Sequence, residues 1–141
     1  MSSQDAPEAD LFADVEVYDT TLRDGAQQEG MNLSVADKMA IAPLLDSMGV
    51  SHIEGGWPGA IPKDTEFFKR AAKELDLDNA ELVAFGATRK PGGEAHSDQQ
   101  VRDLIDAETD IVTLVAKSDI RHVERALRTD GVENLAMIRD T

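Results

Sequence analysis

Two charged side chains beside a glycine are the first feature of this sequence with an evident use in chemistry. The string DTTLRDGAQ at residues 19–27 sets Arg23 next to Asp24 and directly before Gly25. A carboxylate is a hard oxygen ligand of the kind that binds Mg²⁺ or Mn²⁺. A guanidinium can stabilise an oxyanion or hold a substrate carboxylate by two hydrogen bonds. The same pair also suits a surface ion pair at a turn, so its use depends on the element that positions it.

A second motif, IEGGWPG at residues 53–59, contains one acidic side chain, Glu54, followed by two glycines and Trp57. Trp57 could stack on a ligand or cover the mouth of a barrel. The sequence has no cysteine, which excludes disulfides, thiolate metal ligands and cysteine nucleophiles. The histidines are interpreted as structural or solvated side chains: His52, His96 and His122.

The elements that must position these motifs are predicted strands that alternate with helices. β-branched and apolar residues mark the strands, and apolar residues three and four apart mark the helices. The predicted strands cover residues 15–19, 52–54, 81–85 and 111–115, and the predicted helices cover residues 34–49, 64–75, 97–105, 119–127 and 133–139. Strands and helices in such alternation indicate a parallel sheet.

The side chains expected to be buried follow from the same periodicity. The first helix is predicted to bury one apolar face, made by Ile41, Leu44, Leu45 and Met48. Pro43 should weaken that helix unless the helix bends there. The second helix is predicted to point inward with Phe67, Phe68, Ala71 and Leu75. The fourth strand, IVTLV, is apolar almost throughout, as expected where both faces of a strand are covered.

Two architectures contain such a sheet, an open doubly wound sheet and a (β/α)8 barrel. A barrel needs about 250 residues, so the 141 residues here supply about half of one. We therefore predict an α/β fold that is the N-terminal half of a (β/α)8 TIM barrel, with about four βα units. Residues 1–14 are expected to be a flexible acidic leader, and residues 15–141 a partial TIM-barrel catalytic domain from a longer protein. Function in such folds lies at the C-terminal ends of the strands, which would bring the two motifs to one edge of the sheet.

Charge and composition exclude several classes of partner. The sequence has 28 acidic against 14 basic residues and a formal net charge of −14. Such a surface repels phosphate backbones, so nucleic acid is not expected as a partner. No apolar run of about 18 residues and no signal peptide is present, so we expect no membrane contact and a cytoplasmic location. The acidity itself fits either an ordinary solvated surface or, as in a halophile, an adaptation to high salt.

The two motifs together resemble the signature of the DRE-TIM metallolyase family, which includes Claisen-type 2-oxoacid synthases and related lyases. That signature has an Arg-Asp pair after the first strand and a Glu after the second, here Arg23, Asp24 and Glu54. Within the family, EGGWPG followed by PKD is similar to the citramalate synthase branch. Further similar strings are FGATR at residues 85–89, KS at 117–118, ALRT at 126–129 and ENLAMIRD at 133–140.

The resemblance implies a reaction and a role for each matching residue. Asp24 would bind a divalent metal, Mg²⁺ or Mn²⁺. Arg23 would stabilise the oxyanion of the 2-oxoacid carbonyl, and Glu54 would orient Arg23. Gln27, together with Arg23, would contact the substrate. The reaction would be an acyl transfer, the Claisen condensation of acetyl-CoA with pyruvate followed by thioester hydrolysis, giving citramalate for isoleucine and branched-chain amino acid biosynthesis.

One part of the family's metal site has no counterpart in this sequence. The family completes the site with a His-x-His pair on a later strand, and no two histidines here have that spacing. We therefore expect the first half of an active site, inactive alone. Half a barrel also leaves two edge strands unpaired, so we expect copies of the chain to associate as a homo-oligomer.

Other interpretations of the same residues stay open at this point. Within the family, the alternatives are an isopropylmalate or homocitrate synthase and a member like HMG-CoA lyase. Asp19 after a strand also faintly resembles the nucleophile of haloacid dehalogenase phosphatases, although Thr21 stands where those have a second acid. A non-catalytic fold module, with an exposed edge that mediates assembly, is the alternative of another class.

Overall fold

The predicted strands form one parallel sheet in the computed structural model, which describes residues 15–141. The strands are β1 (Tyr18–Asp19), β2 (His52–Gly56), β3 (Glu81–Ala87) and β4 (Ile111–Val115), in the order β1-β2-β3-β4. A doubly wound sheet reverses its strand order at a switch point, whereas consecutive parallel strands in unbroken order are the arrangement of a barrel. The fold is therefore the partial barrel that the sequence predicts. The predicted leader, residues 1–14, lies outside the described residues.

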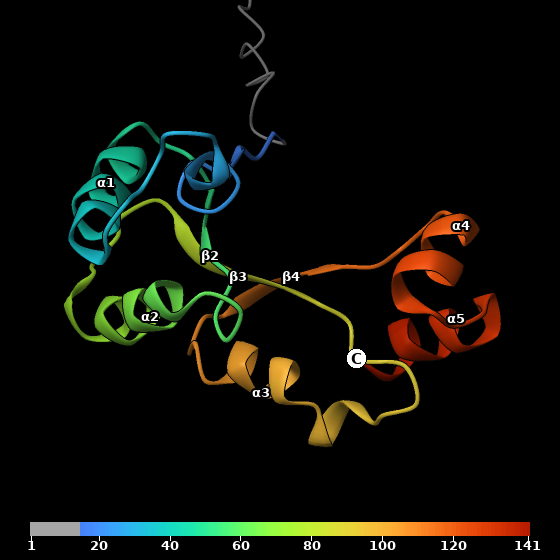
Figure 1. The fold of residues 1–141 in the computed structure, drawn as a ribbon. Coiled ribbons are helices and arrows are strands. Elements are labelled where there is room, and N and C mark those ends of the chain that lie inside the picture. Colours follow the sequence, from blue (N-terminus) through green and yellow to red (C-terminus); the bar gives the residue numbers. More distant parts are fainter. Residues whose placement is uncertain (1–14) are drawn as a thin grey trace, which may run out of the picture.

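Helices follow the strands and cover one side of the sheet. They are α1 (Val35–Ser47), α2 (Pro62–Glu74), α3 (Gln99–Ile105), α4 (Ile120–His122) and α5 (Gly131–Asp140), with the shorter turns η1 (Gly25–Gln27), η2 (Ala95–Ser97) and the π-helical η3 (Val123–Leu127). They form an arc around the sheet from α1 through α2 and α3 to α5 (Figure 1). The helix predicted at residues 119–127 is thus divided into α4 and η3. Within the described residues, no helix combines the length and the apolarity needed to cross a membrane.

The core lies between the sheet and these helices. Alternate residues of a strand point to opposite faces of the sheet, and one set faces the helices. Ile53 of β2 and Ala84 of β3 are fully buried there, in one cluster with Leu104 of α3. The residues predicted to point inward from α2 all pack in this cluster: Phe67, Phe68, Ala71 and Leu75.

Two glycines of the strands let the helices approach the sheet closely. A Cβ atom on Gly55 would lie 2.7 Å from Cε1 of Phe67, and one on Gly86 would lie 2.6 Å from Cδ1 of Leu104. Any larger residue would have to push α2 or α3 away from the strand, because the core has no room to give. These glycines therefore set the spacing between the sheet and the helical layer.

The start of α1 agrees with the sequence, but its predicted buried face is wrong in part. Ser34 and Asp37 form a reciprocal capping box, and Pro43 lies inside the helix without ending it. Leu44 and Met48, predicted to be inside, are 63% and 76% exposed. The buried side chains of α1 are Lys38, Ala42, Leu45 and Asp46. The helix is turned this way because its buried charges have partners: Lys38 pairs with Asp64, and Asp46 accepts hydrogen bonds from the backbone N–H groups of residues 78–80.

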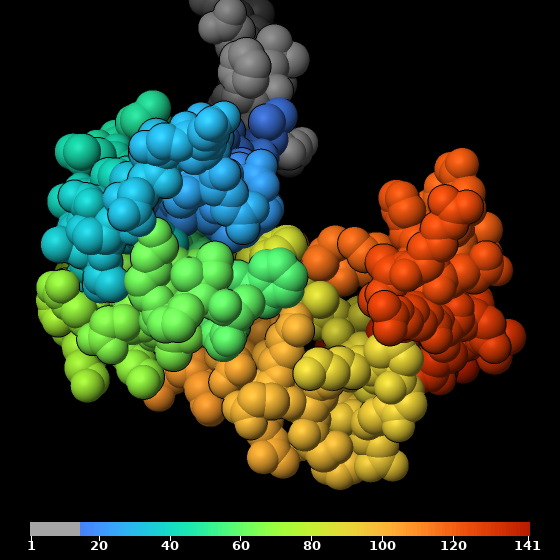
Figure 2. Space-filling model, viewed as in Figure 1, coloured from blue at the N-terminus to red at the C-terminus, as the bar shows by residue number. Residues whose placement is uncertain are grey.

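The prediction that β4 is covered on both faces is also wrong. Val112 and Leu114 are 44% and 38% exposed. The apolar pattern is that of a strand with neighbours on every side, whereas within residues 15–141 β4 is an edge strand paired with β3 alone. The surface is hollowed between the N-terminal elements and the helices α4 and α5, with β4 between them (Figure 2).

Candidate active site

A tight turn at the end of β1 presents the first motif. The backbone N–H of Arg23 donates to Thr20 O at 3.1 Å. The carboxylate of Asp19 accepts from the backbone N–H and the hydroxyl of Thr21 at 2.9 and 3.1 Å. Asp19 is thus used to build the turn, and Arg23 and Asp24 lie at the C-terminal end of the strand, where the sequence predicts them.

The buried carboxylate of Glu54, on β2, is the centre of the arrangement. Its side chain is 2% exposed, against 16% for Arg23. Nε of Arg23 donates to Glu54 Oε1, and the hydroxyl of Tyr18 donates to Glu54 Oε2 at 2.6 Å. A carboxylate removed from water must be paired, and here a cation and a hydroxyl each take one of its oxygens. The expected contact between Glu54 and Arg23 is therefore present, and it fixes the direction of the guanidinium.

Tyr18 is a member of this cluster that the sequence reasoning missed. Burial of the phenol, and then its hydrogen bond to Glu54, raise the pKa of Tyr18 from its ordinary value of 10.0 to about 12. The tyrosine oxygen also lies 2.6 Å from Oγ1 of Thr113 on β4. The neutral Tyr18 hydroxyl thus joins β1 directly to β4 through Thr113, and to β2 through Glu54.

The face of the Arg23 guanidinium lies on an aromatic ring. Its Cζ is 4.0 Å from the centre of the Phe85 ring, a cation–π contact. Trp57 meets the same ring edge to face, with centroids 5.1 Å apart. Arg23 is therefore held by hydrogen bonds in its plane and by a cation–π contact on its face, while Trp57 packs on Phe85.

Strand register explains why these residues meet. Tyr18 is paired with His52, and Glu54 follows two residues later, on the same face of β2. Phe85 is paired with Thr113 across β3 and β4. All point away from the helical layer, because side chains alternate along each strand. Alternation within the predicted strands was the signal that could have found Tyr18, Phe85 and Thr113.

Asp24 and Gln27 remain on the surface beside this cluster. The Asp24 side chain is 65% exposed, and its Oδ1 accepts from Arg23 Nη1 at 2.9 Å. Gln27 is exposed on η1, and its backbone N–H donates to Asp24 O at 3.0 Å. In residues 15–141, no three side chains of the His, Cys, Asp or Glu type gather as a metal site would require. The described residues therefore fit one ligand of a metal site and not a complete one.

The histidines take the positions expected of structural or solvated side chains. His52 begins β2 and stacks on Tyr18, with ring centroids 5.8 Å apart. His96 is 77% exposed, and His122 is exposed at the end of α4.

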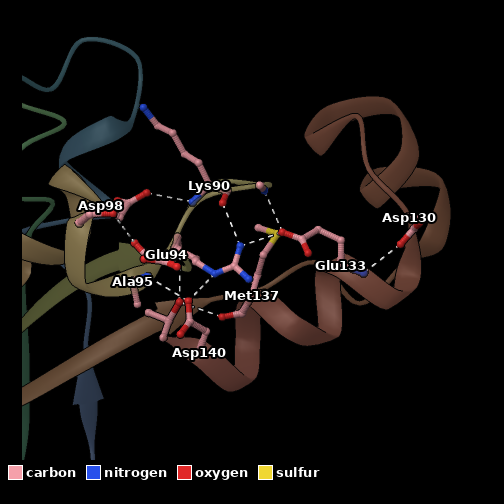
Figure 3. Close-up of polar contacts among 12 residues, drawn as sticks. Lys90, Glu94, Ala95, Asp98, Asp130, Glu133, Met137 and Asp140 are labelled. Carbon is pink, nitrogen blue, oxygen red and sulfur yellow. Dashed lines mark hydrogen bonds and ion pairs between the residues drawn. The ribbon is translucent and has the colours of Figure 1, made fainter.

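A second polar cluster joins α5 to the loop after β3 (Figure 3). The buried guanidinium of Arg89 pairs with Glu133 at 2.7 Å and with Asp140 at 2.6 Å. Glu133 also accepts from Gly92 N, and Asp140 from Ala95 N. The hydrogen bond from Arg89 lowers the pKa of Glu133, and the bond from Ala95 N, followed by the Arg89 contact, lowers the pKa of Asp140. Because the charged groups of this cluster pair with one another, its role is to hold α5 against the loop after β3.

A cavity of about 270 Å³ lies at the same ends of the strands. Its wall includes Trp57, Thr88, Val115, Lys117 and Met137. Nε1 of Trp57 is closed to solvent and has no hydrogen-bond partner among residues 15–141. The cavity thus adjoins the Phe85–Trp57 contact.

Known proteins with similar sequences identify the family of this chain. The (R)-citramalate synthase of Streptomyces coelicolor is 63% identical over 89% of this chain, and that of Aquifex aeolicus is 52% identical over 90%. The chain spans only 23% and 24% of the length of these relatives. The crystal structure of the HMG-CoA lyase of Bacillus subtilis superposes with a TM-score of 0.64 at 16% identity, over 89% of this chain and 40% of that one, and shows the shared fold. Residues 14–141 match the family model described as HMGL-like, and the chain belongs to that family.

Proposed function

We propose that residues 15–141 form one part of the active site of an (R)-citramalate synthase, an acyltransferase that condenses acetyl-CoA with pyruvate and hydrolyses the thioester. The observation that carries this proposal is Arg23, held by the buried Glu54 at the end of β1 with the exposed Asp24 beside it. High identity to relatives of that name supports the choice of reaction. The chain matches about a quarter of those relatives, so the proposed activity is that of a larger assembly.

The proposed work of Arg23 follows from its hydrogen bonds. Nε of Arg23 donates to Glu54, and Nη1 donates to Asp24. Among the described residues, no hydrogen bond uses Nη2 of Arg23, so this group can donate to the 2-oxoacid oxygen that becomes an alkoxide as the carbon–carbon bond forms. A donor fixed in advance needs no reorganisation during the reaction, which is the proposed reason for the buried Glu54. The exposed amide of Gln27 is proposed to contact the same substrate.

Asp24 is proposed to supply one oxygen ligand to a divalent cation. When bound, such an ion polarises a carbonyl oxygen as a Lewis acid. Residues 15–141 hold no group of three metal-ligating side chains, so the other ligands would have to come from outside this set. The identity of the ion, Mg²⁺ or Mn²⁺, stays a prediction.

The family match separates the alternative functions that the sequence left open. The phosphatase interpretation is wrong, because the chain belongs to the HMGL-like family and its Asp19 caps a turn. Isopropylmalate and homocitrate synthases and an enzyme like HMG-CoA lyase share the family and are separated from the proposal by substrate. The non-catalytic module is separated from it by any turnover that depends on Arg23.

A chimera tests the proposal in a complete enzyme. Residues 15–141 replace the matching segment of the Streptomyces coelicolor (R)-citramalate synthase, and citramalate is measured from pyruvate and acetyl-CoA with Mg²⁺ or Mn²⁺. We expect turnover, and we expect Arg23→Ala in the chimera to lower kcat by about 10²–10³, the effect of losing one oxyanion donor.

Arg121→Ala is the matched control, since the Arg121 side chain is 73% exposed and pairs with Asp119. It should leave kcat unchanged. A folded chimera that makes no citramalate, or an Arg23→Ala variant with full activity, contradicts the proposal. Preference for a longer 2-oxoacid over pyruvate would favour the isopropylmalate alternative.

A further inference from the structure

The helices α1 and α2 meet at an ion pair that is almost closed to solvent. Lys38 of α1 is 1% exposed and Asp64 of α2 is 2% exposed, and Nζ of Lys38 donates to Oδ1 of Asp64. Burial lowers the pKa of Lys38, and Asp64 opposes that shift. Lysine is rarely buried, and removing two charges from water is costly even when they pair. Stability alone is therefore a poor explanation for this pair.

The remaining hydrogen bonds of the pair go to the backbone at the end of β2. Nζ of Lys38 also donates to Gly55 O at 2.9 Å, and Oδ2 of Asp64 accepts from Trp57 N at 2.9 Å. These two backbone groups flank Gly56, and the register between β2 and β3 shifts between Glu54 and Gly56. A Cβ on Gly56 would lie 2.5 Å from Cγ of Asp64, so the carboxylate touches the backbone there. The ion pair thus binds the backbone of β2 where its pairing with β3 is irregular.

Gly55, whose carbonyl accepts from Lys38, directly follows Glu54, the residue that orients Arg23. Oε1 and Oε2 of Glu54 must both stay within hydrogen-bond reach of their partners, Arg23 and Tyr18. We propose that Lys38 and Asp64 are positioning residues, which fix the end of β2 and thereby hold the Glu54 carboxylate between Arg23 and Tyr18. The importance of this positioning for catalysis rests on the proposed function, whereas the position of Glu54 itself can be measured without turnover.

The test must separate positioning of Glu54 from a general contribution to folding. Nε–H of Arg23 is a local reporter, because it is hydrogen-bonded to Glu54 and does not touch Lys38 or Asp64. Its exchange with solvent hydrogen can be followed by heteronuclear NMR of arginine side chains. The resonance is assigned by its absence in Arg23→Lys.

The test variant is Lys38→Met combined with Asp64→Asn. It removes both charges at nearly constant size, a change that buried ion pairs often tolerate, and it removes the donor to Gly55 O. We expect exchange of the Arg23 Nε–H to be about tenfold faster or more, as for the loss of a hydrogen bond to a charged group. Leu45→Ala is the matched control: Leu45 is buried on the same helix and lies in the core cluster, and it should leave that exchange unchanged.

Two results overturn the proposal. One is an Arg23 Nε–H exchange rate equal to that of the unaltered protein in a double variant whose circular dichroism is native. The other is an equal rise in Leu45→Ala. If the double variant does not fold, Lys38→Arg replaces it, since it keeps a positive charge beside Asp64 but moves the donor from the position of Nζ at Gly55 O. A smaller rise in exchange is then expected, and no rise overturns the proposal. A chimera that fails to make citramalate leaves this measurement valid.

Discussion

The hydrogen bond between Tyr18 and Glu54 depends on the proton of the Tyr18 hydroxyl. The hydroxyl of Tyr18 donates to Oε2 of Glu54 at 2.6 Å and can do so only while it is protonated. Burial of the phenol, and then its hydrogen bond to the Glu54 carboxylate, disfavour the phenolate and raise the pKa of Tyr18 from 10.0 to about 12. The folded chain therefore keeps this proton at a pH where the unfolded chain has lost it.

The pH dependence of stability follows from that difference. A group whose folded pKa is raised contributes stability that is fully present below its unfolded pKa and is lost as the pH rises through its folded pKa. We expect the Tyr18 contribution to be complete below pH 10.0 and to fall away toward about pH 12. Urea unfolding across this range measures it, with Tyr18→Phe for comparison. The difference in stability between the two proteins should shrink as the pH rises; a constant difference would contradict the shift.

How much of the site the sequence predicts depends on how local its signal is. Arg23, Asp24 and Glu54 stand in short motifs at predicted strand ends, and the structure brings Arg23 to both carboxylates. Lys38 and Asp64 lie 26 residues apart on two helices. Their contact depends on how those helices are rotated, and no periodicity of apolar residues reports that rotation. A residue that works through tertiary contact leaves little local trace.

At the scale of elements, the distance between α2 and the sheet depends on the absence of a side chain at Gly55. A Cβ on Gly55 would meet Cε1 of Phe67 at 2.7 Å and Cδ1 of Leu82 at 3.1 Å. We expect Gly55→Ala to destabilise the protein by about 1–3 kcal/mol, the usual effect of overpacking a core. Denaturant unfolding measures the change.

Gly93→Ala is the control for this prediction, because a Cβ there would be no closer than 3.5 Å to its nearest neighbour, Lys90 O. Its effect on the free energy of unfolding should be within about 0.5 kcal/mol. Equal stabilities of Gly55→Ala and the unaltered protein would show that α2 can move away at no cost.

The elements themselves were easier to predict than their surroundings. Strand and helix positions follow from local periodicity, and all four predicted strands are present, although β1 covers only Tyr18–Asp19 of the predicted 15–19. The rotation of α1 was mispredicted because two buried charges, Lys38 and Asp46, outweigh the apolar stripe of Leu44 and Met48. Sequence periodicity assigns charged residues to the surface. Their burial becomes evident only when the structure shows the partners that they contact.

At the scale of the whole molecule, the formal charge of −14 predicts a response to salt. Repulsion among like charges destabilises the compact state, and at 1 M salt it is screened beyond about 3 Å. We expect the midpoint of thermal unfolding to rise from low to molar KCl. Sucrose is the control, because it favours burial without screening charge. A midpoint that is flat or falls with KCl would leave an ordinary acidic surface as the explanation.

The edges of the sheet predict how this 141-residue chain behaves in solution. β1 and β4 each have one strand partner in the described residues, and β4 exposes Val112 and Leu114. Unpaired parallel edges with apolar side chains are surfaces on which another chain can add a strand. We therefore expect light scattering to give the mass of two or more associated copies, and Val112→Lys, a charge on the edge strand, to reduce that mass. Val132→Lys is the control, since Val132 is 80% exposed on α5, away from the edge.

Association would not complete the active site. A second copy brings the same Asp24 and the same three histidines, so it adds no His-x-His pair to either site. Burial of the edges can therefore improve folding without producing turnover. We expect the associated chain, assayed with pyruvate, acetyl-CoA and Mg²⁺ or Mn²⁺, to form no citramalate, while the chimera with the same residues does. A stable monomer would contradict the edge argument, and citramalate formed by the chain alone would mean that residues 1–141 hold a catalytic site that Arg23, Asp24 and Glu54 do not account for.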